Sequence, residues 1–578
     1  MRLNQPDKRR LLKGILVAIV LFPAGFYLWH YVKFVVLPTL LPSAPREIIV
    51  GTIPKIPSNT SRILLLMIDG LALEPFADAL SQNHLPNVSR LIQTRPTLKT
   101  EAISTFPSAT SPSVPELVSG RYAEIENLPS PGAVHAFDRQ QRRVIRYVTN
   151  PDSWQWPVVT LFDATKDLSA ITVFEGRWDG PKSILTQFNM ARQAVLETIG
   201  AHGLTEGDRG PVEAFLKAIQ SDEPPVVSLV VLNDFDMAAH FYGPESSKAR
   251  QALISADGFI GQILDTLEKT SDPHHRSLLD QTNIILFGDH GHARSGEFVD
   301  LVKFFKHRDL KAFDVSTIPH VVFRERLGTL WTEWPDVIMV SGGSNVSQLY
   351  LKQVSGDWQR PAASDDQTTM GIDLASLASD IVRTPGIDQV LWNTQNGDIA
   401  VVSAESRPAY IKVSSDSEQK RFAYIIADDA QQDPFGYLEH AETRNLICYQ
   451  SQLTDACFHT RTEWFDKSFK SLYPGAIPLI PKAFHPQRFT GDLMITLKPG
   501  YTFIRGQKGD HGNLYRDAVI TPLILNGPGI TPCEESHRPR LVDLYPSVAV
   551  LLGADPADPS FKALDGRVLD CVLPPRQD

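Results

Sequence analysis

Three short apolar runs, each followed at once by polar residues, constrain the fold of this chain more than any other feature. They cover residues 62–68, 226–232 and 284–287, and they end in Asp69-Gly70, in Asn233-Asp234 and in Gly288-Asp289. Uninterrupted apolar runs of this length are typical of parallel strands buried on both faces. With helical stretches between them, they predict a doubly wound, mostly parallel α/β sheet flanked by helices. Ligands bind beyond the carboxyl ends of such strands, which is where these acidic residues lie.

Composition excludes several other classes of protein. The 578 residues include 56 basic and 66 acidic side chains, a net charge of −10, which argues against a nucleic-acid polymer as partner. Hydrophobic residues make up 42% of the chain, enough for a large core and too many for a disordered protein. The four cysteines form no C-x-x-C pair, so neither a zinc ribbon nor a thioredoxin-type motif is expected.

The N-terminal segment predicts a membrane anchor. Residues 14–32 are uncharged, and at about 1.5 Å per residue a helix over them spans roughly the hydrocarbon thickness of a bilayer. The basic residues Lys8, Arg9, Arg10 and Lys13 precede this run and place the N-terminus in the cytoplasm, with the remaining chain outside, in a periplasm or extracellular space. A cleaved signal peptide is the alternative, but Pro45 follows the best small-residue exit and disfavours cleavage there.

Export would allow the cysteines to be oxidised. The pairings closest in sequence are Cys448 with Cys457 and Cys533 with Cys571. Four cysteines allow three connectivities, and spacing alone leaves all three open.

Four segments are expected along the chain. Residues 1–45 hold the cytoplasmic tail, the anchor and the start of a proline-rich linker, and residues 46–305 form the first part of the catalytic α/β core. Residues 306–490 are less regular and are interpreted as an inserted or cap subdomain. The α/β pattern resumes in residues 491–578, with a strand at 518–525 and a helix at 541–552. Further helices are expected at 117–120, 160–167, 181–198, 212–220 and 246–269.

Six carboxylates and imidazoles near the strand ends are candidate metal ligands: Asp69, Asp236, His240, Asp289, His290 and His511. Asp236 and His240 are four residues apart, so on a helix both side chains leave the same face and can share one cation. Oxygen and imidazole donors suit Zn²⁺ or a related divalent ion such as Mn²⁺. Any single histidine of the set is more often an ordinary core or surface residue, so the prediction depends on the combination.

A hydroxyl nucleophile is also available. Residues 105–113 carry several serines and threonines ahead of a predicted helix, whose N-terminus offers free N–H groups and a positive dipole end to a phosphoryl group. Ordinary helix capping by one of these hydroxyls is the alternative.

The ordered motifs resemble the alkaline phosphatase superfamily, and most closely its type I phosphodiesterase/nucleotide pyrophosphatase branch. The matching positions are Asp69-Gly70, Phe106-Pro107 with Thr110, Pro112 and Gly120, then Asp236 with His240, Gly243 and Pro244, Asp289-His290-Gly291, and His511-Gly512. A frame starting from Thr105 fails, because it places Pro115 where the branch has glycine.

The resemblance implies an alkaline phosphatase-like fold with two divalent cations. Asp236, His240 and His511 would hold one cation, while Asp69, Asp289 and His290 would hold the other, with Thr110 bridging them as nucleophile. Ser113 stands where the branch often has an asparagine that contacts the phosphoryl oxygen, although serine can still donate a hydrogen bond. His292 and Lys508 lie beside matched motifs without an assigned role.

We therefore expect a membrane-anchored, two-metal phosphoric ester hydrolase of phosphodiesterase or nucleotide pyrophosphatase type, with a phosphate ester as substrate. A phospho-headgroup transferase and a phosphomonoesterase of the same superfamily are the alternatives. A non-catalytic envelope protein is a further alternative, but it predicts a missing ligand or nucleophile.

Overall fold

The structure is a computed structural model that describes residues 51–573, except 53, 58–60, 123–134, 147–157, 166–167, 169, 174–181, 184–206, 316–332, 342–344, 354–355, 359–372, 415–419 and 485–488. The expected anchor at 14–32 lies outside the described residues. Within the described part of the chain, no helix is both long enough and apolar enough to span a bilayer.

A seven-stranded sheet forms the core, in the order β2-β23-β8-β1-β7-β5-β6. All pairings from β8 to β6 are parallel, and β23 alone among these strands runs against its two neighbours. The predicted doubly wound, mostly parallel sheet is thus confirmed, with one reversed strand. The strand bounds are β1 (Arg62–Ile68), β2 (Thr97–Ile103), β5 (Ala170–Val173), β6 (Lys182–Ser183), β7 (Val227–Leu232), β8 (Thr282–Phe287) and β23 (Ile520–Asn526).

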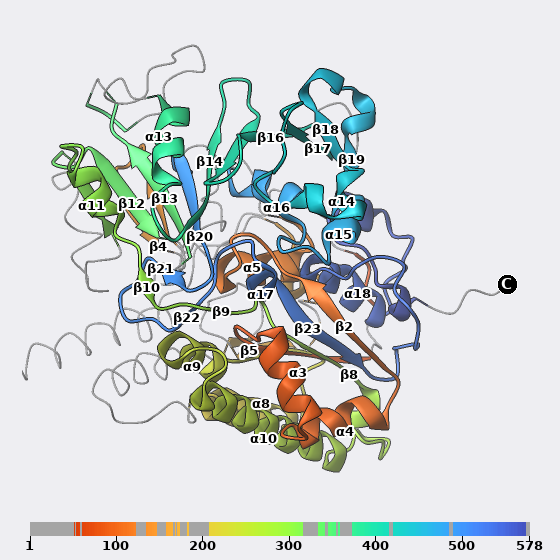
Figure 1. The fold of residues 1–578 in the computed structure, drawn as a ribbon. Coiled ribbons are helices and arrows are strands. Elements are labelled where there is room, and N and C mark those ends of the chain that lie inside the picture. Colours follow the sequence, from red (N-terminus) through yellow and green to blue (C-terminus); the bar gives the residue numbers. More distant parts are fainter. Residues whose placement is uncertain are drawn as a thin grey trace, which may run out of the picture.

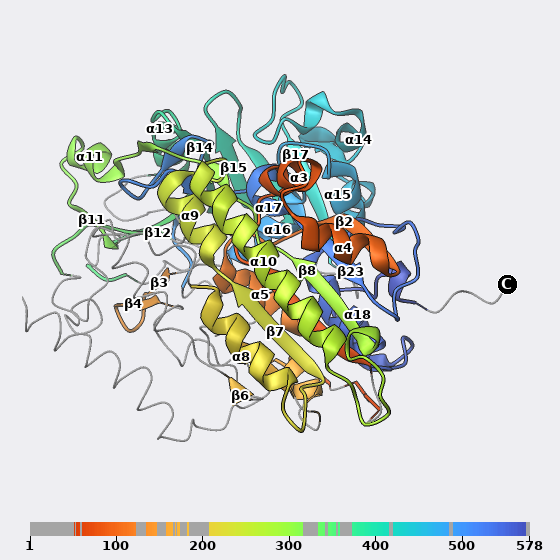
Figure 2. The ribbon, with the colours of Figure 1, turned by 90° about the horizontal axis from the view of Figure 1, so that it is seen from below.

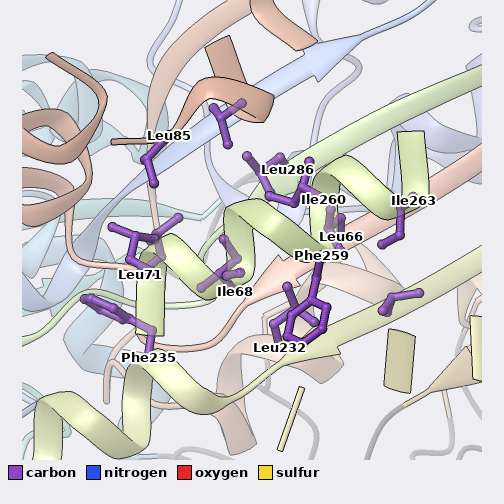
Figure 3. Packing of buried hydrophobic residues seen from close by; sticks show 14 of the residues in the cluster. Leu66, Ile68, Leu71, Leu85, Leu232, Phe235, Phe259, Ile260, Ile263 and Leu286 are labelled. Atoms are coloured by element: carbon purple, nitrogen blue, oxygen red, sulfur yellow. The ribbon is translucent and has the colours of Figure 1, made fainter. Parts of the chain in front are cut away.

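Alternate residues of the central strand β1 serve two separate cores. Leu64, Leu66 and Ile68 join the cluster on one face of the sheet, part of which Figure 3 shows. Ile63 and Leu65 join the cluster on the other face. Because successive strand side chains point to opposite faces, an uninterrupted apolar run is what a strand covered on both sides requires.

Helices cover both faces of this sheet (Figures 1 and 2). One face carries α3 (Leu73–Ser81), α4 (Pro86–Thr94), α8 (Arg209–Ile219), α9 (Asp234–Tyr242) and α10 (Ser247–Lys269). The other carries α5 (Thr110–Ser119), α6 (Leu161–Ala164) and α18 (Leu544–Leu551). Figure 2 shows the long helix α10 running along the sheet beside α9 and α8.

A second, ten-stranded sheet is inserted after β8 and lies above the first in the view of Figure 1. Its order is β11-β12-β13-β20-β14-β15-β16-β17-β18, with β19 paired to β17. Its strands are β11 (Ala312–Asp314), β12 (Val337–Ser341), β13 (Val346–Leu351), β14 (Ile387–Asn393), β15 (Ile399–Ser403), β16 (Ala409–Val413), β17 (Arg421–Ile426), β18 (Ile447–Tyr449), β19 (His459–Thr460) and β20 (Leu493–Leu497).

The strand β20 lies on the other side of the expected domain boundary. The sequence places residues 491–578 in the core, yet β20 pairs with β13 and β14 in the second sheet. Its five residues are all buried, so its apolar run looks the same as that of a core strand. Sequence pattern alone could not assign it to the correct sheet.

In the described part of the chain, six further α-helices and three pairs of short strands lie outside the core-sheet layers. They are α11 (Leu301–Lys306), α13 (Leu374–Ile381), α14 (Ala441–Arg444), α15 (Arg461–Ser468), α16 (Ala476–Ala483) and α17 (Arg516–Val519), with the strand pairs β3 (His135–Asp138) and β4 (Arg143–Arg146), β9 (Ala293–Arg294) and β22 (Gly509–Asp510), and β10 (Glu297–Phe298) and β21 (Tyr501–Thr502).

Helix predictions differ from the structure in three places, the mildest of which is the helix expected at 160–167, which is the shorter α6 and ends at Ala164. The helix expected at 117–120 begins earlier, at Thr110. It includes the prolines at 112 and 115, which lie outside the range expected from the sequence. A helix was expected at 181–198, but Lys182 and Ser183 form β6 and residues 184–198 lie outside the described residues.

Two disulfides are present, and they are the pairings closest in sequence. Cys448 is bonded to Cys457 and Cys533 to Cys571, with Cα–Cα distances of 5.5 and 5.3 Å. Glu535 lies close to the Cys533–Cys571 pair, and these three side chains could together resemble a metal-binding cluster. Because the two cysteines are bonded to each other, we do not regard the group as a metal site.

Candidate active site

Three adjacent parallel strands deliver most of the predicted ligands to one edge of the core sheet. Asp69 follows β1 directly, Asp289 and His290 follow β8 after one glycine, and α9, which carries Asp236 and His240, follows β7. Since β7, β1 and β8 are neighbours and run parallel, their carboxyl ends meet at the same place.

His511 reaches this edge on a short ladder that forms after the second sheet. The strand β22 precedes His511 and pairs antiparallel with β9, and the amide of Lys508 donates to the carbonyl of His240 at 2.8 Å. A Cβ atom on Gly509 would lie 2.3 Å from the carbonyl oxygen of Ala239, so only glycine allows this close approach to α9.

The first candidate metal set, hereafter the Asp236 set, comprises Asp236, His240 and His511. Nε2 of His240 lies 3.1 Å from Nε2 of His511 and 3.4 Å from Oδ2 of Asp236. Nε2 of His511 lies 3.8 Å from Oδ1 of Asp236.

Backbone contacts fix the ring orientation of both imidazoles in the Asp236 set. Nδ1 of His240 lies 3.2 Å from the carbonyl of Gly509, and Nδ1 of His511 lies 2.8 Å from the carbonyl of Ser108. A carbonyl can only accept, so in both rings Nδ1 carries the proton and Nε2 presents a lone pair. Two lone pairs facing one another at 3.1 Å beside a carboxylate are the arrangement that a cation stabilises.

The second set, hereafter the Asp69 set, comprises Asp69, Asp289 and His290. Nε2 of His290 lies 3.4 Å from Oδ1 of Asp69 and 3.5 Å from Oδ2 of Asp289. Oδ1 of Asp289 accepts from the amide of Gly70 at 3.1 Å, whereas its Oδ2 is buried with no hydrogen-bond partner among the described residues. Nδ1 of His290 faces the carbonyl of Gly291 at 2.9 Å, so that Nε2 is again the ring nitrogen that could bind a metal ion.

The spacing of the ligand atoms fits a divalent cation in each set. Zinc bonds of about 2.0–2.2 Å in a tetrahedron place ligand atoms about 3.3–3.6 Å apart. The two sets show separations of 3.1–3.8 Å and 3.4–3.5 Å. The six residues therefore come together as two groups that could each hold a metal ion, and the ion's identity is open to zinc or a related cation.

Thr110 lies beside the Asp69 set. Its hydroxyl donates to Oδ1 of Asp69 at 3.2 Å and lies 3.3 Å from Nε2 of His290. It is the first residue of α5, whose N-cap is Ala109 and has no side-chain cap. The Thr110 hydroxyl is therefore not used for helix capping, which was the alternative role for this segment.

Thr105, the rival hydroxyl, has a different environment. Its hydroxyl donates to Oε2 of Glu116 at 2.6 Å and also contacts Nζ of Lys482, and all three side chains are buried. This group connects α5 to α16 of the second-sheet region.

Ser113 does not replace the asparagine of the resembling branch. The side chain is 1% exposed, and its hydroxyl donates to the backbone carbonyl of Asp289 at 2.8 Å. The serine can donate a hydrogen bond, as the sequence indicated, but in this structure its proton is engaged in fixing the chain beside the Asp69 set.

Burial and neighbouring charges shift the acidities of the site. Burial acts to raise the pKa of Asp236, but His240, His292 and His511 outweigh it and hold that pKa well below its usual range. Burial raises the pKa of Asp289. Burial, reinforced by His290 and His240, lowers the pKa of His511, which favours the neutral imidazole that a metal requires.

His292 was missing from the predicted ligand set, but the structure places it in the site. Its Nε2 lies 2.7 Å from Oδ1 of Asp236, and its ligand atom falls within 4.8 Å of those of the Asp236 set. Sequence offered one signal, the His-x-His spacing after β8, but its meaning depends on the pairing of β9 with β22. Lys508, the other unassigned neighbour, is exposed.

Comparison with known proteins identifies the family. Residues 63–352, half of the chain, match the family model of type I phosphodiesterase/nucleotide pyrophosphatase. Ectonucleotide pyrophosphatase/phosphodiesterase family member 1 of Homo sapiens is 37% identical over 73 residues, which are 13% of this chain and 7% of that protein. Family member 7 of Mus musculus is 29% identical over 109 residues, 19% of this chain and 23% of that protein.

Two solved structures share the overall extent of the chain. They are murine and human ectonucleotide pyrophosphatase/phosphodiesterase 5, at 11% and 12% identity and TM-scores of 0.47 and 0.49, each comparison covering 86% of this chain and 95% of the other. The segments shared with the two curated relatives span less than a quarter of those proteins. On the extent of the family-model match, the chain is a member of the type I phosphodiesterase/nucleotide pyrophosphatase family.

Proposed function

We propose that this protein hydrolyses phosphoric esters, diesters in preference to monoesters, with Thr110 as the nucleophile and a divalent cation in each of the two sets. The observation that carries the proposal is the position of the Thr110 hydroxyl, within 3.3 Å of both Asp69 and His290 at the first residue of a helix. Membership of a family described as phosphodiesterase and nucleotide pyrophosphatase supports the preference for diesters.

The site's own residues divide the work. Asp236, His240 and His511 would hold one cation, and Asp69, Asp289 and His290 the other. Two such cations, Zn²⁺ or Mn²⁺, would supply charge neutralisation for the attacking and leaving oxygens of an in-line displacement.

Thr110 provides the covalent step. Its Oγ1 gives up its proton to solvent and forms a bond to phosphorus while one ester oxygen leaves as the alcohol or phenol product. A diester then leaves a threonine phosphodiester that keeps its second ester group, a monoester leaves phosphothreonine, and water hydrolyses either one to free Thr110. The first-turn N–H groups of α5 have no helical acceptor, so they and the helix dipole favour the negative phosphoryl oxygens. This backbone contribution matters more here because the Ser113 hydroxyl is engaged elsewhere.

The test compares Thr110 with Thr105 in the full-length chain, using bis(4-nitrophenyl) phosphate and 4-nitrophenyl phosphate. Thr110→Ala should lower the rate by several orders of magnitude, and Thr110→Ser should retain appreciable activity because the hydroxyl survives. Thr105→Ala, a matched loss of a nearby hydroxyl, should cost far less. Acid quenching during turnover should trap a 4-nitrophenylphosphoryl group on Thr110 from the diester and a phosphoryl group from the monoester, and peptide mass spectrometry would distinguish the two.

Several outcomes would contradict the proposal. Full turnover in excess chelator would rule out the two-cation site. Near-normal activity of Thr110→Ala would rule out Thr110 as the nucleophile. Transfer of the phosphoryl group to an added alcohol in place of water would favour a transferase instead. Faster turnover of the monoester would reverse the substrate preference.

We propose also that residues 14–32 anchor the protein, with the catalytic part outside the cytoplasm. The charge asymmetry around the uncharged run supports this topology. The two disulfides of the described chain suit an oxidising compartment. Protease added to the outer face of the membrane should digest the region from Asp69 to His511, and protection of that region would refute the topology.

A further inference from the structure

His292 differs from the other imidazoles of the site in the direction of its hydrogen bonds. His240, His290 and His511 each turn Nδ1 towards a backbone carbonyl and Nε2 towards the ligand atoms of a set. His292 instead turns Nε2 towards Oδ1 of Asp236, and its Nδ1 is buried without a hydrogen-bond partner among the described residues.

We propose that His292 is a positioning residue that fixes the Asp236 carboxylate by donating a hydrogen bond from Nε2 to Oδ1. This inference rests on the proposed two-cation function, and it assigns to the Asp236 set a supporting residue that the motifs do not include. With Oδ1 engaged, Oδ2, which lies 3.4 Å from Nε2 of His240, is the oxygen presented to the cation.

The contact distance favours a supporting role over that of a fourth ligand. Two atoms bound to one zinc ion lie about 3.3–3.6 Å apart, whereas 2.7 Å is the length of a hydrogen bond to a carboxylate. A fourth protein ligand would also close the coordination position that a catalytic metal keeps open.

The surroundings hold the ring of His292 in place. Its side chain is fully buried, and its ring packs edge-on against the ring of His240, with centroids 4.7 Å apart. On the other side, Gly70 has a φ of +65°, and a Cβ atom there would lie 2.6 Å from Oδ1 of Asp236 and 2.8 Å from Cδ2 of His292. The glycine of the Asp-Gly motif therefore leaves the space that the His292–Asp236 pair occupies.

His292 is also tied to the arrival of His511. The strand β9 begins at the next residue, Ala293, which pairs with Asp510, the residue before His511. One short ladder therefore carries both a ligand of the Asp236 set and the residue that orients its carboxylate.

The test measures metal affinity directly, by competition between the full-length chain and a chromophoric zinc chelator. His292→Ala should weaken binding of one of the two cations by about 10–100-fold, as for other residues that orient metal ligands, and leave the other unchanged. His292→Gln keeps an N–H donor near the same oxygen and should recover most of the affinity. His274→Ala, the loss of an exposed histidine outside the site, serves as the control and should bind both cations as the parent does.

X-ray absorption of the zinc-loaded protein separates the remaining outcomes. A positioning role predicts three imidazoles shared by two zinc ions, unchanged in His292→Gln. A fourth imidazole that disappears in both variants would overturn the proposal and make His292 a ligand. Unchanged affinity in His292→Ala would also overturn it while leaving the two-cation function intact, whereas a parent chain that binds no zinc would remove both.

Discussion

A buried ion pair connects the nucleophile helix to the second-sheet region. Nζ of Lys482, on α16, lies 2.5 Å from Oε1 of Glu116, on α5, and the two side chains are 1% and 2% exposed. Oε2 of the same carboxylate accepts from the Thr105 hydroxyl at 2.6 Å. Since Thr110 begins α5, this pair helps to hold the helix that carries the proposed nucleophile.

Removing one partner should be expensive, because the other charge stays buried. Lys482→Met keeps most of the aliphatic volume but removes the cation that lies 2.5 Å from the buried Glu116 carboxylate, and losses of about 3–5 kcal/mol in unfolding free energy are typical of such changes. Adding Glu116→Gln removes the buried negative charge while its amide oxygen still accepts from Thr105. The double variant should therefore be more stable than Lys482→Met alone.

The assay is denaturant unfolding of the parent, both single variants and the double variant, followed by tryptophan fluorescence. Arg407→Met provides a matched control, because the Arg407–Asp429 pair has a similar length of 2.8 Å but side chains 66% and 64% exposed. That change should cost about 1 kcal/mol or less. A loss below about 1 kcal/mol for Lys482→Met, or losses that simply add in the double variant, would refute the reasoning.

Two further predictions concern stability. Burial raises the pKa of Asp388 from its ordinary 3.8 to about 7, although the hydroxyls of Tyr473 and Tyr515 donate to it. The folded state therefore favours the protonated carboxyl, and the protein loses stability as the pH rises from about 4 to 7. Asp388→Asn should therefore gain about 3 kcal/mol over the parent between pH 5 and pH 8 in zinc-saturated unfolding experiments, and a pH-independent difference would contradict this. Replacing both Cys533 and Cys571 by alanine opens a cross-link across 38 residues and should cost about 4 kcal/mol, a loss that reduction of a variant already lacking the Cys448–Cys457 bond should reproduce.

The core of the fold was predictable because its central strands leave few alternatives. The runs that became β1, β7 and β8 are apolar at every position or nearly so, which fits a strand covered on both faces and no exposed element. Once those strands are parallel neighbours, Asp69 and Asp289 must emerge at one edge. The strand β7 ends at the same edge, so Asp236 and His240 were expected there as well, although the sequence predicted no helix over the residues that form α9.

The remaining parts depended on contacts that no local pattern encodes. The order of the second sheet places β20 between β13 and β14, far from both in sequence, and its apolar run resembles a core strand. His292 looks like any histidine beside a motif until the pairing of β9 with β22 sets it against Asp236. Ser113 could be judged a phosphoryl donor only as long as its partner, the carbonyl of Asp289, was unknown.

The position of His511 explains how a candidate ligand so distant in sequence can belong to the site. The chain leaves the core through β9 and β10 and returns through β21 and β22, and these strands pair with one another, Phe298 opposite Thr502 and Arg294 opposite Gly509. The two stems of the inserted region are therefore joined before the second sheet begins, so that sheet can be large without moving His511 away from His290.

The inserted region nevertheless touches the site, which argues that it does more than interrupt the core. The amide of Asn345, just before β13, donates to the carbonyl of His511 at 3.2 Å, and Lys482 of α16 reaches α5. One contact bears on His511, a candidate ligand of the Asp236 set, and the other on the helix that begins at Thr110. Because rigid neighbours keep metal ligands and nucleophiles in their working geometry, we expect changes at these two contacts to alter turnover through the position of His511 and Thr110.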